Sequence, residues 1–250
     1  MASSPSPSPG VVRSVRQWWA EVALREGRLA AGRQLLSALW EFLRESTPQR
    51  RRLRYGDAEY DWENRVNTTS AAVGWRERLL GTFHSPYQPT EPALFHEMIA
   101  DLRALISIDF HEFVFVDLGS GKGRTLLMAG NYPFKRIVGV ELLPALNQIA
   151  EENLAKYRGA SQKCFTIESV CADAGEFVFP DEPMVIYLFN PFPEAGLRRV
   201  LGNLTRSLLQ RPRAVYVLYH NPLLEHVLGE NGAFNKIGGT HQYRVYAARI

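Results

Sequence analysis

The sequence contains very little cysteine. Cys164 and Cys171 are the only cysteines among 250 residues, and both stand in apolar surroundings. We therefore expect two buried, reduced thiols and no disulfide, which is typical of a reducing compartment. The six histidines do not have the spacing of zinc ligands, so the sequence predicts no metal site.

Long apolar stretches are also missing. No run of about 18 apolar residues occurs, so no transmembrane helix is expected. The first ten residues, MASSPSPSPG, lack the apolar core of a secretory signal, and residues 1–12 are predicted to be a disordered tail. Hydrophobic residues make up 46% of the chain and charged residues 22%, which is typical of a globular protein. We expect a cytoplasmic protein.

Positive charge is concentrated at one end of the chain. The formal net charge is +3, yet residues 1–54 contain ten arginines and four glutamates and are therefore +6, which leaves −3 for the remainder. Tryptophan and leucine recur among these arginines at helical spacing. Three interpretations of residues 13–45 stay open: a helical cap on the following domain, a helix that contacts a membrane surface, or a surface for a protein partner or nucleic acid.

An acidic, aromatic stretch follows at residues 55–62, with the sequence YGDAEYDW. One interpretation is a lip that attracts a cationic amine substrate. The other is a surface loop whose aromatic rings pack on the domain. Together with the helical segment it forms a predicted N-terminal extension over residues 13–85, and an α/β domain is predicted over residues 86–250.

A glycine-rich turn organises this second domain. Phe113–Val116 has the apolar, β-branched and aromatic character of a buried strand. Asp117 is expected to end that strand, and Arg124–Gly130 is expected to form a helix. Between them stand Gly119, Gly121 and Gly123, where the backbone must turn sharply and admit a ligand. Strand, glycine turn and helix are typical of a nucleotide-binding sheet.

The neighbours of the turn indicate which nucleotide it binds. A dinucleotide site would have glycine at position 124, where this chain has Arg124. Asp117 would repel a phosphate but suits a ligand with a cationic end. The next predicted strand, Arg136–Val140, ends in Glu141, where a carboxylate can accept both hydroxyls of a ribose. These features favour S-adenosylmethionine over NAD.

Four short motifs occur in order: DLGSGKG, GVE, CADA and NPF. As an ordered set they resemble the motifs of class I S-adenosylmethionine-dependent methyltransferases over roughly Tyr87 to Ile250. The segment FVDLGSGKGR and the upstream segment YGDAEYDW are similar to sequences of a bacterial subgroup of these methyltransferases whose substrate is unassigned. The resemblance implies a three-layer, Rossmann-like α/β sandwich with a seven-stranded, mostly parallel sheet and an antiparallel edge hairpin, preceded by the helical extension.

The remaining elements follow from apolar periodicity. Helices are predicted from Pro92 through Leu105, over Leu142–Tyr157 and over Glu194–Leu209, and strands over Phe165–Cys171, Met184–Phe189, Ala214–Tyr219, Phe234–Ile237 and His241–Ala248.

The resemblance also implies a set of cofactor-binding residues. Asp173 would accept from the adenine amine, although an aspartate in a turn is common. Thr90 would touch the methionyl end or cap the helix that contains Pro92. The full set is Tyr87, Thr90, Asp117, Gly119, Ser120, Gly121, Gly123, Glu141, Leu142, Asp173, Ala174 and Asn190.

Asn190, Phe192 and His220 are the candidate catalytic residues. The first two lie in Asn-Pro-Phe-Pro, which departs from the Asn/Asp-Pro-Pro-aromatic motif of amine-methylating members. This turn either orients the methyl acceptor or only supports the cofactor pocket. His220, predicted at the end of a strand, is either a general base or a hydrogen-bonded structural histidine.

The predicted activity is methyl transfer from S-adenosylmethionine to an unidentified acceptor. A protein amine or a small metabolite is favoured over nucleic acid, because the second domain is not basic. The alternative is a non-catalytic cofactor-binding or interaction module that acts through the arginine-rich N-terminal helix. An NAD-dependent oxidoreductase is disfavoured by Asp117 and Arg124. The sequence predicts no particular oligomeric state.

Overall fold

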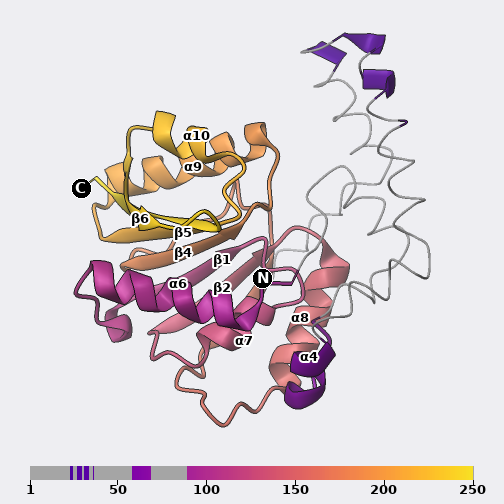
Figure 1. The fold of residues 1–250 in the computed structure, drawn as a ribbon, viewed down its shortest axis with the longest axis vertical. Coiled ribbons are helices and arrows are strands. Elements are labelled where there is room, and N and C mark those ends of the chain that lie inside the picture. Colours follow the sequence, from indigo (N-terminus) through magenta and orange to yellow (C-terminus); the bar gives the residue numbers. More distant parts are fainter. Residues whose placement is uncertain are drawn as a thin grey trace, which may run out of the picture. The chain divides into compact units, whose positions relative to one another are not determined.

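The computed structural model describes residues 58–68 and 89–249, together with a few positions between 23 and 36. The chain divides into two compact units. One comprises Met1–Glu59 and Thr69–Gln88, and the other comprises Tyr60–Thr68 and Pro89–Ile250. The predicted tail, most of the N-terminal helix and Tyr87 lie outside the described residues. The second unit contains the sheet shown in Figure 1.

A seven-stranded sheet forms the middle layer of this unit. Its strands lie in the order β3-β2-β1-β4-β5-β7-β6. All pairs among β1 to β5 are parallel, whereas β7 is antiparallel to both of its neighbours. The predicted Rossmann-like sheet with an antiparallel edge hairpin is therefore confirmed. The strands are β1 (Val114–Leu118), β2 (Arg136–Glu141), β3 (Ile167–Cys171), β4 (Met184–Phe189), β5 (Val215–His220), β6 (Phe234–Gly239) and β7 (Tyr243–Ala248).

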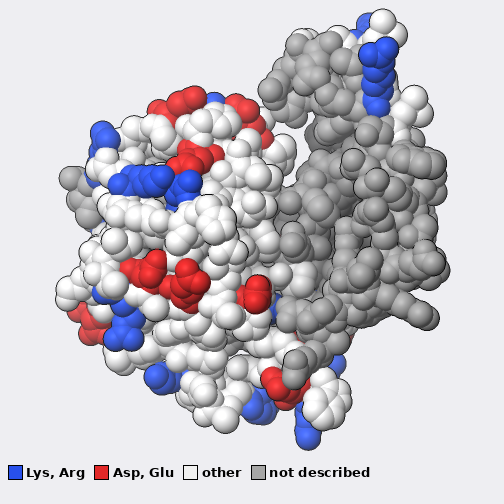
Figure 2. Space-filling view, in the orientation of Figure 1, with Lys and Arg blue, Asp and Glu red and all other residues white. Residues whose placement is uncertain are grey.

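Helices cover both faces of the sheet. One face packs on α6 and α7, and α8 lies along β2 and β3. The opposite face packs on α9 and α10. On the face seen in Figure 2, charged side chains of the two signs are interspersed. The helices are α4 (Ala58–Asn64), α6 (Pro92–Leu105), α7 (Arg124–Ala129), α8 (Pro144–Lys156), α9 (Glu194–Gln210) and α10 (Glu225–Glu230), with a 3₁₀ turn η2 (Phe110–Glu112).

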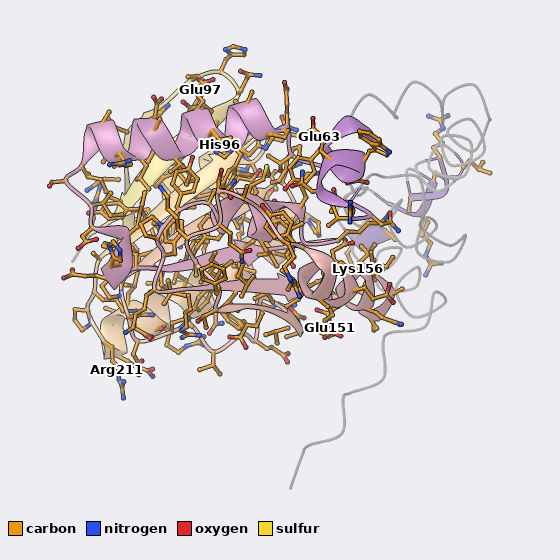
Figure 3. All side chains as sticks on the ribbon, turned by 90° about the horizontal axis from the view of Figure 1, so that it is seen from below. Glu63, His96, Glu97, Glu151, Lys156 and Arg211 are labelled. Carbon is orange, nitrogen blue, oxygen red and sulfur yellow. The ribbon has the colours of Figure 1, made fainter. Side chains whose placement is uncertain are left out.

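Side chains that alternate along the strands contribute to two hydrophobic cores, one on each face of the sheet. In β1, Val114 and Val116 join the core beneath α9, whereas Phe115 joins the core beneath α6. Successive side chains of a strand point to opposite faces, and a strand covered on both faces is apolar throughout. Figure 3 shows α6, with His96 and Glu97, running across its face of the sheet. No helix among the described residues is long and apolar enough to cross a membrane.

Several predicted boundaries were wrong. β1 continues through Asp117 to Leu118, because its pairing with β2 and β4 extends that far. β3 begins at Ile167, and the preceding Phe165 is 78% exposed. Two helices were not predicted: α10, and α4, which falls in the stretch expected to be a loop.

Two expectations about single side chains also need correction. Glu91, not Thr90, occupies the N-cap position of α6, with Pro92 in the first turn as predicted. The Thr90 hydroxyl bonds to a tyrosine instead. Both cysteines are free, but only Cys164 is buried; Cys171 is exposed. It ends β3, which lies at the edge of the sheet and is covered less completely than the central strands.

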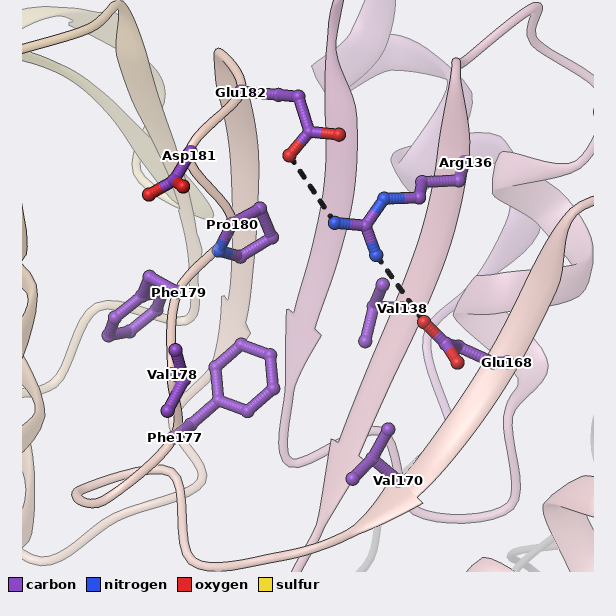
Figure 4. A pocket seen from close by; sticks show the side chains of 10 residues that line it. All are labelled: Arg136, Val138, Glu168, Val170, Phe177, Val178, Phe179, Pro180, Asp181 and Glu182. Atoms are coloured by element: carbon purple, nitrogen blue, oxygen red, sulfur yellow. Dashed lines mark hydrogen bonds and ion pairs between the residues drawn. The ribbon is translucent and has the colours of Figure 1, made fainter. Parts of the chain in front are cut away.

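The connection from β3 to β4 contains no helix, and a hollow of about 360 Å³ lies beside it (Figure 4). Arg136, the first residue of β2, extends across this hollow and pairs with Glu168 and Glu182, both at 3.4 Å. Phe177 and Phe179 contribute to its wall. Because β2 starts here, the hollow lies away from the carboxyl edge of the parallel strands, where α/β proteins bind their ligands.

A substitution at Leu204 on α9 tests the packing of the core beneath α9. The Leu204 side chain is 1% exposed. We expect Leu204→Ala to lower the free energy of unfolding by about 2–5 kcal/mol, because the substitution leaves a cavity. Urea denaturation measures this loss. The matched control is Leu209→Ala on the same helix, where the side chain is 79% exposed. A cost at Leu209 as large as that at Leu204 would contradict the assigned face of α9.

Candidate functional site

Three glycines with left-handed backbone form the turn after β1. Their φ angles are 88° at Gly119, 55° at Gly121 and 81° at Gly123, a region that other residues rarely adopt. Space is also limited: a Cβ at Gly119 would lie 2.5 Å from the Cβ of Pro191, and one at Gly123 would lie 3.2 Å from that of Ala150. Glycine is therefore required here both by conformation and by packing.

Glu141, the last residue of β2, is joined to this turn by hydrogen bonds. Its Oε2 accepts from the backbone N–H of Gly121 at 2.8 Å, and its Oε1 accepts from that of Leu143 at 2.8 Å. Burial raises the pKa of this carboxyl, and the backbone donors work against that rise. A carboxylate has about four lone-pair sites, so Glu141 can still accept from a ligand hydroxyl. Leu142, beside it, is exposed.

Asp117 lies on the neighbouring strand with its side chain only 2% exposed. Burial raises the pKa of its carboxyl to about 8; a hydrogen bond with Thr125 opposes this rise, and the charge of Glu141 adds to it. At neutral pH a nearby cation would therefore lower the pKa of Asp117 and ionise it. The carboxyl edge of β1 and β2 thus favours a positively charged group.

A chain of hydroxyl and imidazole groups crosses the adjacent part of this edge. The Tyr187 hydroxyl lies 2.7 Å from Thr90 Oγ1 and 2.8 Å from His220 Nδ1. The Phe189 ring stacks on His220 with centroids 3.8 Å apart. Burial lowers the pKa of His220 to about 4 and raises that of Tyr187 well above its usual value. Both groups are therefore neutral at pH 7, and His220 is oriented by its neighbours.

The turn after β4 reaches the glycine turn. Pro191 fills the space above Gly119, and the preceding Asn190 has a left-handed φ of 44°. The Asn190 Oδ1 accepts from the Tyr219 hydroxyl at 3.2 Å. Phe192 is half-buried and packs against the core beneath α9. The structure thus brings Asn190 and Gly119 to one edge, and the acceptor-binding role of Phe192 stays a prediction.

The residues predicted to hold adenine already have protein partners. One carboxylate oxygen of Asp173 accepts from the backbone N–H of Gly175 at 2.8 Å, and the other pairs with Arg199 of α9. If an adenine amine donated to Asp173, that carboxylate would bind the amine and Arg199 at the same time. Ala174 is buried in the core, and Ser120 is 5% exposed with an Oγ that has no partner among the described residues.

Sequence reasoning missed one part of the site, the upstream clamp, by which we mean Tyr60–Thr68. The Arg124 side chain is 1% exposed, and its Nε donates to Thr68 Oγ1 at 2.6 Å. Its Nη2 donates to Asp61 Oδ1 at 3.3 Å, and its guanidinium lies 4.7 Å from the centre of the Tyr60 ring. The first residue after the glycine turn is therefore surrounded by residues from far upstream.

A second set of bonds joins the clamp to the turn. Asn67 and Asn153 pair reciprocally: the Asn67 N–H donates to Asn153 Oδ1 at 2.8 Å, and Asn153 Nδ2 donates to the Asn67 carbonyl at 2.9 Å. The same Nδ2 lies 2.9 Å from the carbonyl of Lys122. The buried Lys122 Nζ donates to Asn67 Oδ1 at 3.3 Å. The two residues that flank Gly123, Lys122 and Arg124, thus both form hydrogen bonds with the clamp.

The clamp decides in part between the two interpretations of the acidic, aromatic stretch. Tyr60 and Asp61 face Arg124, as the packing interpretation requires, whereas Trp62 is 84% exposed. A signal was available in the sequence: Arg124 interrupts a stretch that is otherwise typical of a buried turn and helix. A buried arginine needs a counter-ion, and the acidic stretch supplies it.

His220 gives a pH-dependent prediction. Its pKa of about 4 in the folded protein lies below the unfolded value of about 6.5. The unfolded chain alone therefore binds the proton between these values, so His220 lowers stability as pH falls. His220→Gln should remove about 2–3 kcal/mol of the stability difference between pH 7 and pH 4.5. Urea denaturation of both proteins at the two pH values tests this, and identical pH dependence would contradict it.

No protein-family model matches this sequence, and no curated protein matches it. Solved structures do match. A ribosomal protein L11 methylase from Lactobacillus delbrueckii subsp. bulgaricus is 15% identical with a TM-score of 0.45, covering 65% of this chain and 80% of that chain. A precorrin-6y C5,15-methyltransferase from Geobacter metallireducens GS-15 is 17% identical with a TM-score of 0.46, covering 65% and 90%.

A third match is a magnesium protoporphyrin IX methyltransferase from Synechocystis PCC 6803 with bound S-adenosylmethionine. It is 12% identical with a TM-score of 0.41, and the match covers 63% of this chain and 77% of that chain. These matches are distant, and the chemistry of the site is argued from the contacts described above.

Proposed function

We propose that this chain is an S-adenosylmethionine-dependent methyltransferase. The observation that carries the proposal is the pair of buried carboxyls on either side of the glycine turn. Asp117 at the end of β1 favours a cationic group, and Glu141 at the end of β2 is fixed by the Gly121 amide. A methionyl group supplies the cation, and a ribose supplies hydroxyls for Glu141.

The same contacts disfavour a dinucleotide. Its pyrophosphate would lie over the glycine turn, close to Asp117, where negative charge is already costly. Arg124 does not offset this, because its side chain is directed to Asp61 and Thr68 of the clamp. A ligand whose positive charge faces Asp117 places no negative charge beside this carboxyl and needs no compensation by Arg124.

In this proposal the chain's own residues bind the cofactor and orient the acceptor. When bound, S-adenosylmethionine supplies a methyl group activated by its sulfonium sulfur. Asp117 and Glu141 would hold the two ends of the ligand. Pro191, in the turn that contains Asn190, packs over Gly119, and this turn would contact the acceptor. His220, held by Tyr187, offers a neutral imidazole beside this turn. Orientation of the acceptor is the main contribution that we assign to the protein.

The acceptor that we favour is a protein amine or a small metabolite. Residues 55–250 have a net charge of −3, and among the described residues on the face in Figure 2 the basic side chains are interspersed with acidic ones. Nucleic-acid binding usually requires a continuous basic patch. The competing proposal is a cofactor-binding module that acts through the arginine-rich residues 13–45. Cofactor binding without turnover on any panel of acceptors would favour that module.

Calorimetric titration tests the cofactor assignment. We expect the wild-type protein to bind S-adenosylmethionine and S-adenosylhomocysteine but not NAD. Asp117→Ala, Gly121→Val and Glu141→Ala should each weaken the affinity more than tenfold, because each removes a contact or a backbone conformation that the ligand needs. Glu168→Ala, at the hollow on the opposite edge, is the control and should bind normally. Unchanged affinity in all three site variants would refute the assignment.

The raised pKa of Asp117 gives a proton-linked prediction. Near pH 7 its carboxyl is largely protonated in the free protein, because its pKa is about 8. A bound cation lowers that pKa, so binding should release a proton from Asp117. Calorimetry in two buffers of different ionisation enthalpy measures the release. Asp117→Asn should release fewer protons than wild type at pH 7, and equal release by the two proteins would contradict this role.

A further inference from the structure

The upstream clamp holds the glycine turn at the residues on both sides of Gly123. Asn67 of the clamp accepts from the side chain of Lys122 and pairs with Asn153, which holds the Lys122 carbonyl. Asp61 and Thr68 of the clamp hold the side chain of Arg124. Figures 1 and 3 show α4, which contains part of the clamp, beside α8, which contains Asn153. The turn is therefore fixed from outside the sheet as well as by Glu141.

Arg124 makes the clamp energetically important. Burial lowers the pKa of its guanidinium to about 10, so the group is still charged at neutral pH. Thr68 donates to Asp61 from both its N–H and its hydroxyl, which orients the carboxylate toward Arg124. Removing Asp61 takes an opposite charge away from a buried guanidinium, which is destabilising. Arg124 is joined directly to Gly123, so a shift of its side chain would be transmitted to the glycine turn.

We infer that Asp61 is a positioning residue of the cofactor site. Acting through Arg124, it holds the glycine turn in the conformation in which the Gly121 amide meets Glu141. The cofactor site is therefore completed by a segment about 60 residues upstream of the turn. The identity of the ligand rests on the proposed function, whereas the positioning of Gly121 does not.

The first experiment measures S-adenosylmethionine affinity by calorimetry on the full chain. We expect Asp61→Asn to weaken binding at least tenfold, and Glu63→Gln, an exposed acid on the same helix, to have no effect. Leu204→Ala controls for a general loss of stability, because it lies in the core beneath α9. Thr68→Val should behave like Asp61→Asn, while Thr68→Ser, which keeps the hydroxyl, should retain binding.

A double-mutant cycle tests whether Asp61 acts through Arg124. In an Arg124→Met background, Asp61→Asn should cause no further loss of affinity, because the charge that it positions is gone. Additive losses would overturn the inference. So would an Asp61→Asn protein that binds as tightly as wild type, or one that loses no more affinity than Leu204→Ala at the same stability.

Amide hydrogen exchange provides a measurement without ligand. In Asp61→Asn, the Gly121 N–H should exchange at least tenfold faster than in wild type, whereas Leu204→Ala with matched stability should not show this selective change. If wild type binds no S-adenosylmethionine but Asp61→Asn still accelerates exchange at Gly121, the proposed function fails and the positioning role stands. Unchanged exchange at Gly121 would overturn the positioning role.

Discussion

The cost of burying charge around the glycine turn is the constraint on which the site depends. Asp117, Lys122, Arg124 and Glu141 are each at most 7% exposed, and an ion removed from water is strongly destabilising unless it is paired or neutralised. The chain meets this constraint in two ways. Arg124 pairs with the clamp, whereas Asp117 is hydrogen-bonded to Thr125 and has a pKa raised by burial.

These two responses assign different roles to the two sides of the turn. On the clamp side the charge of Arg124 is compensated within the protein by Asp61. On the ligand side a carboxyl is left whose ionisation depends on an incoming cation. Under the proposed function, the clamp side would pre-organise the backbone and the Asp117 side would respond to the charge of the ligand. The Glu141 bond to Gly121 lies between the two sides.

The central sheet could be predicted because its signals are local. The central parallel strands β1, β2, β4 and β5, covered on both faces, are short and largely apolar. Polar residues such as Glu141 and Asn190 stand at their carboxyl ends. The glycines were identifiable because a left-handed turn admits few other residues. The order of the strands required the resemblance to a family, since periodicity alone does not fix which strands are neighbours.

The clamp and the polar chain were not predicted, because both join residues far apart in the sequence and the one local signal was the position of Arg124. Thr90 looked like a helix cap, yet its hydroxyl bonds to Tyr187, 97 residues later. Tyr187 itself lies inside an apolar run and gives no local sign of a polar role. Asp61 looked like part of an acidic surface, and only the buried position of Arg124 shows where its charge is directed.

The chemistry near His220 bears on the methyl acceptor that we propose. An alcohol is a weak nucleophile that needs a base with a pKa near neutrality. His220 has a pKa of about 4, and Tyr187 stays protonated, so neither group is a strong base at pH 7. An acceptor with an available lone pair, such as a neutral amine, needs only to be oriented. We therefore expect the Asn190 turn and the His220 imidazole to align such an acceptor by hydrogen bonding, which agrees with a protein amine or small metabolite rather than a sugar hydroxyl.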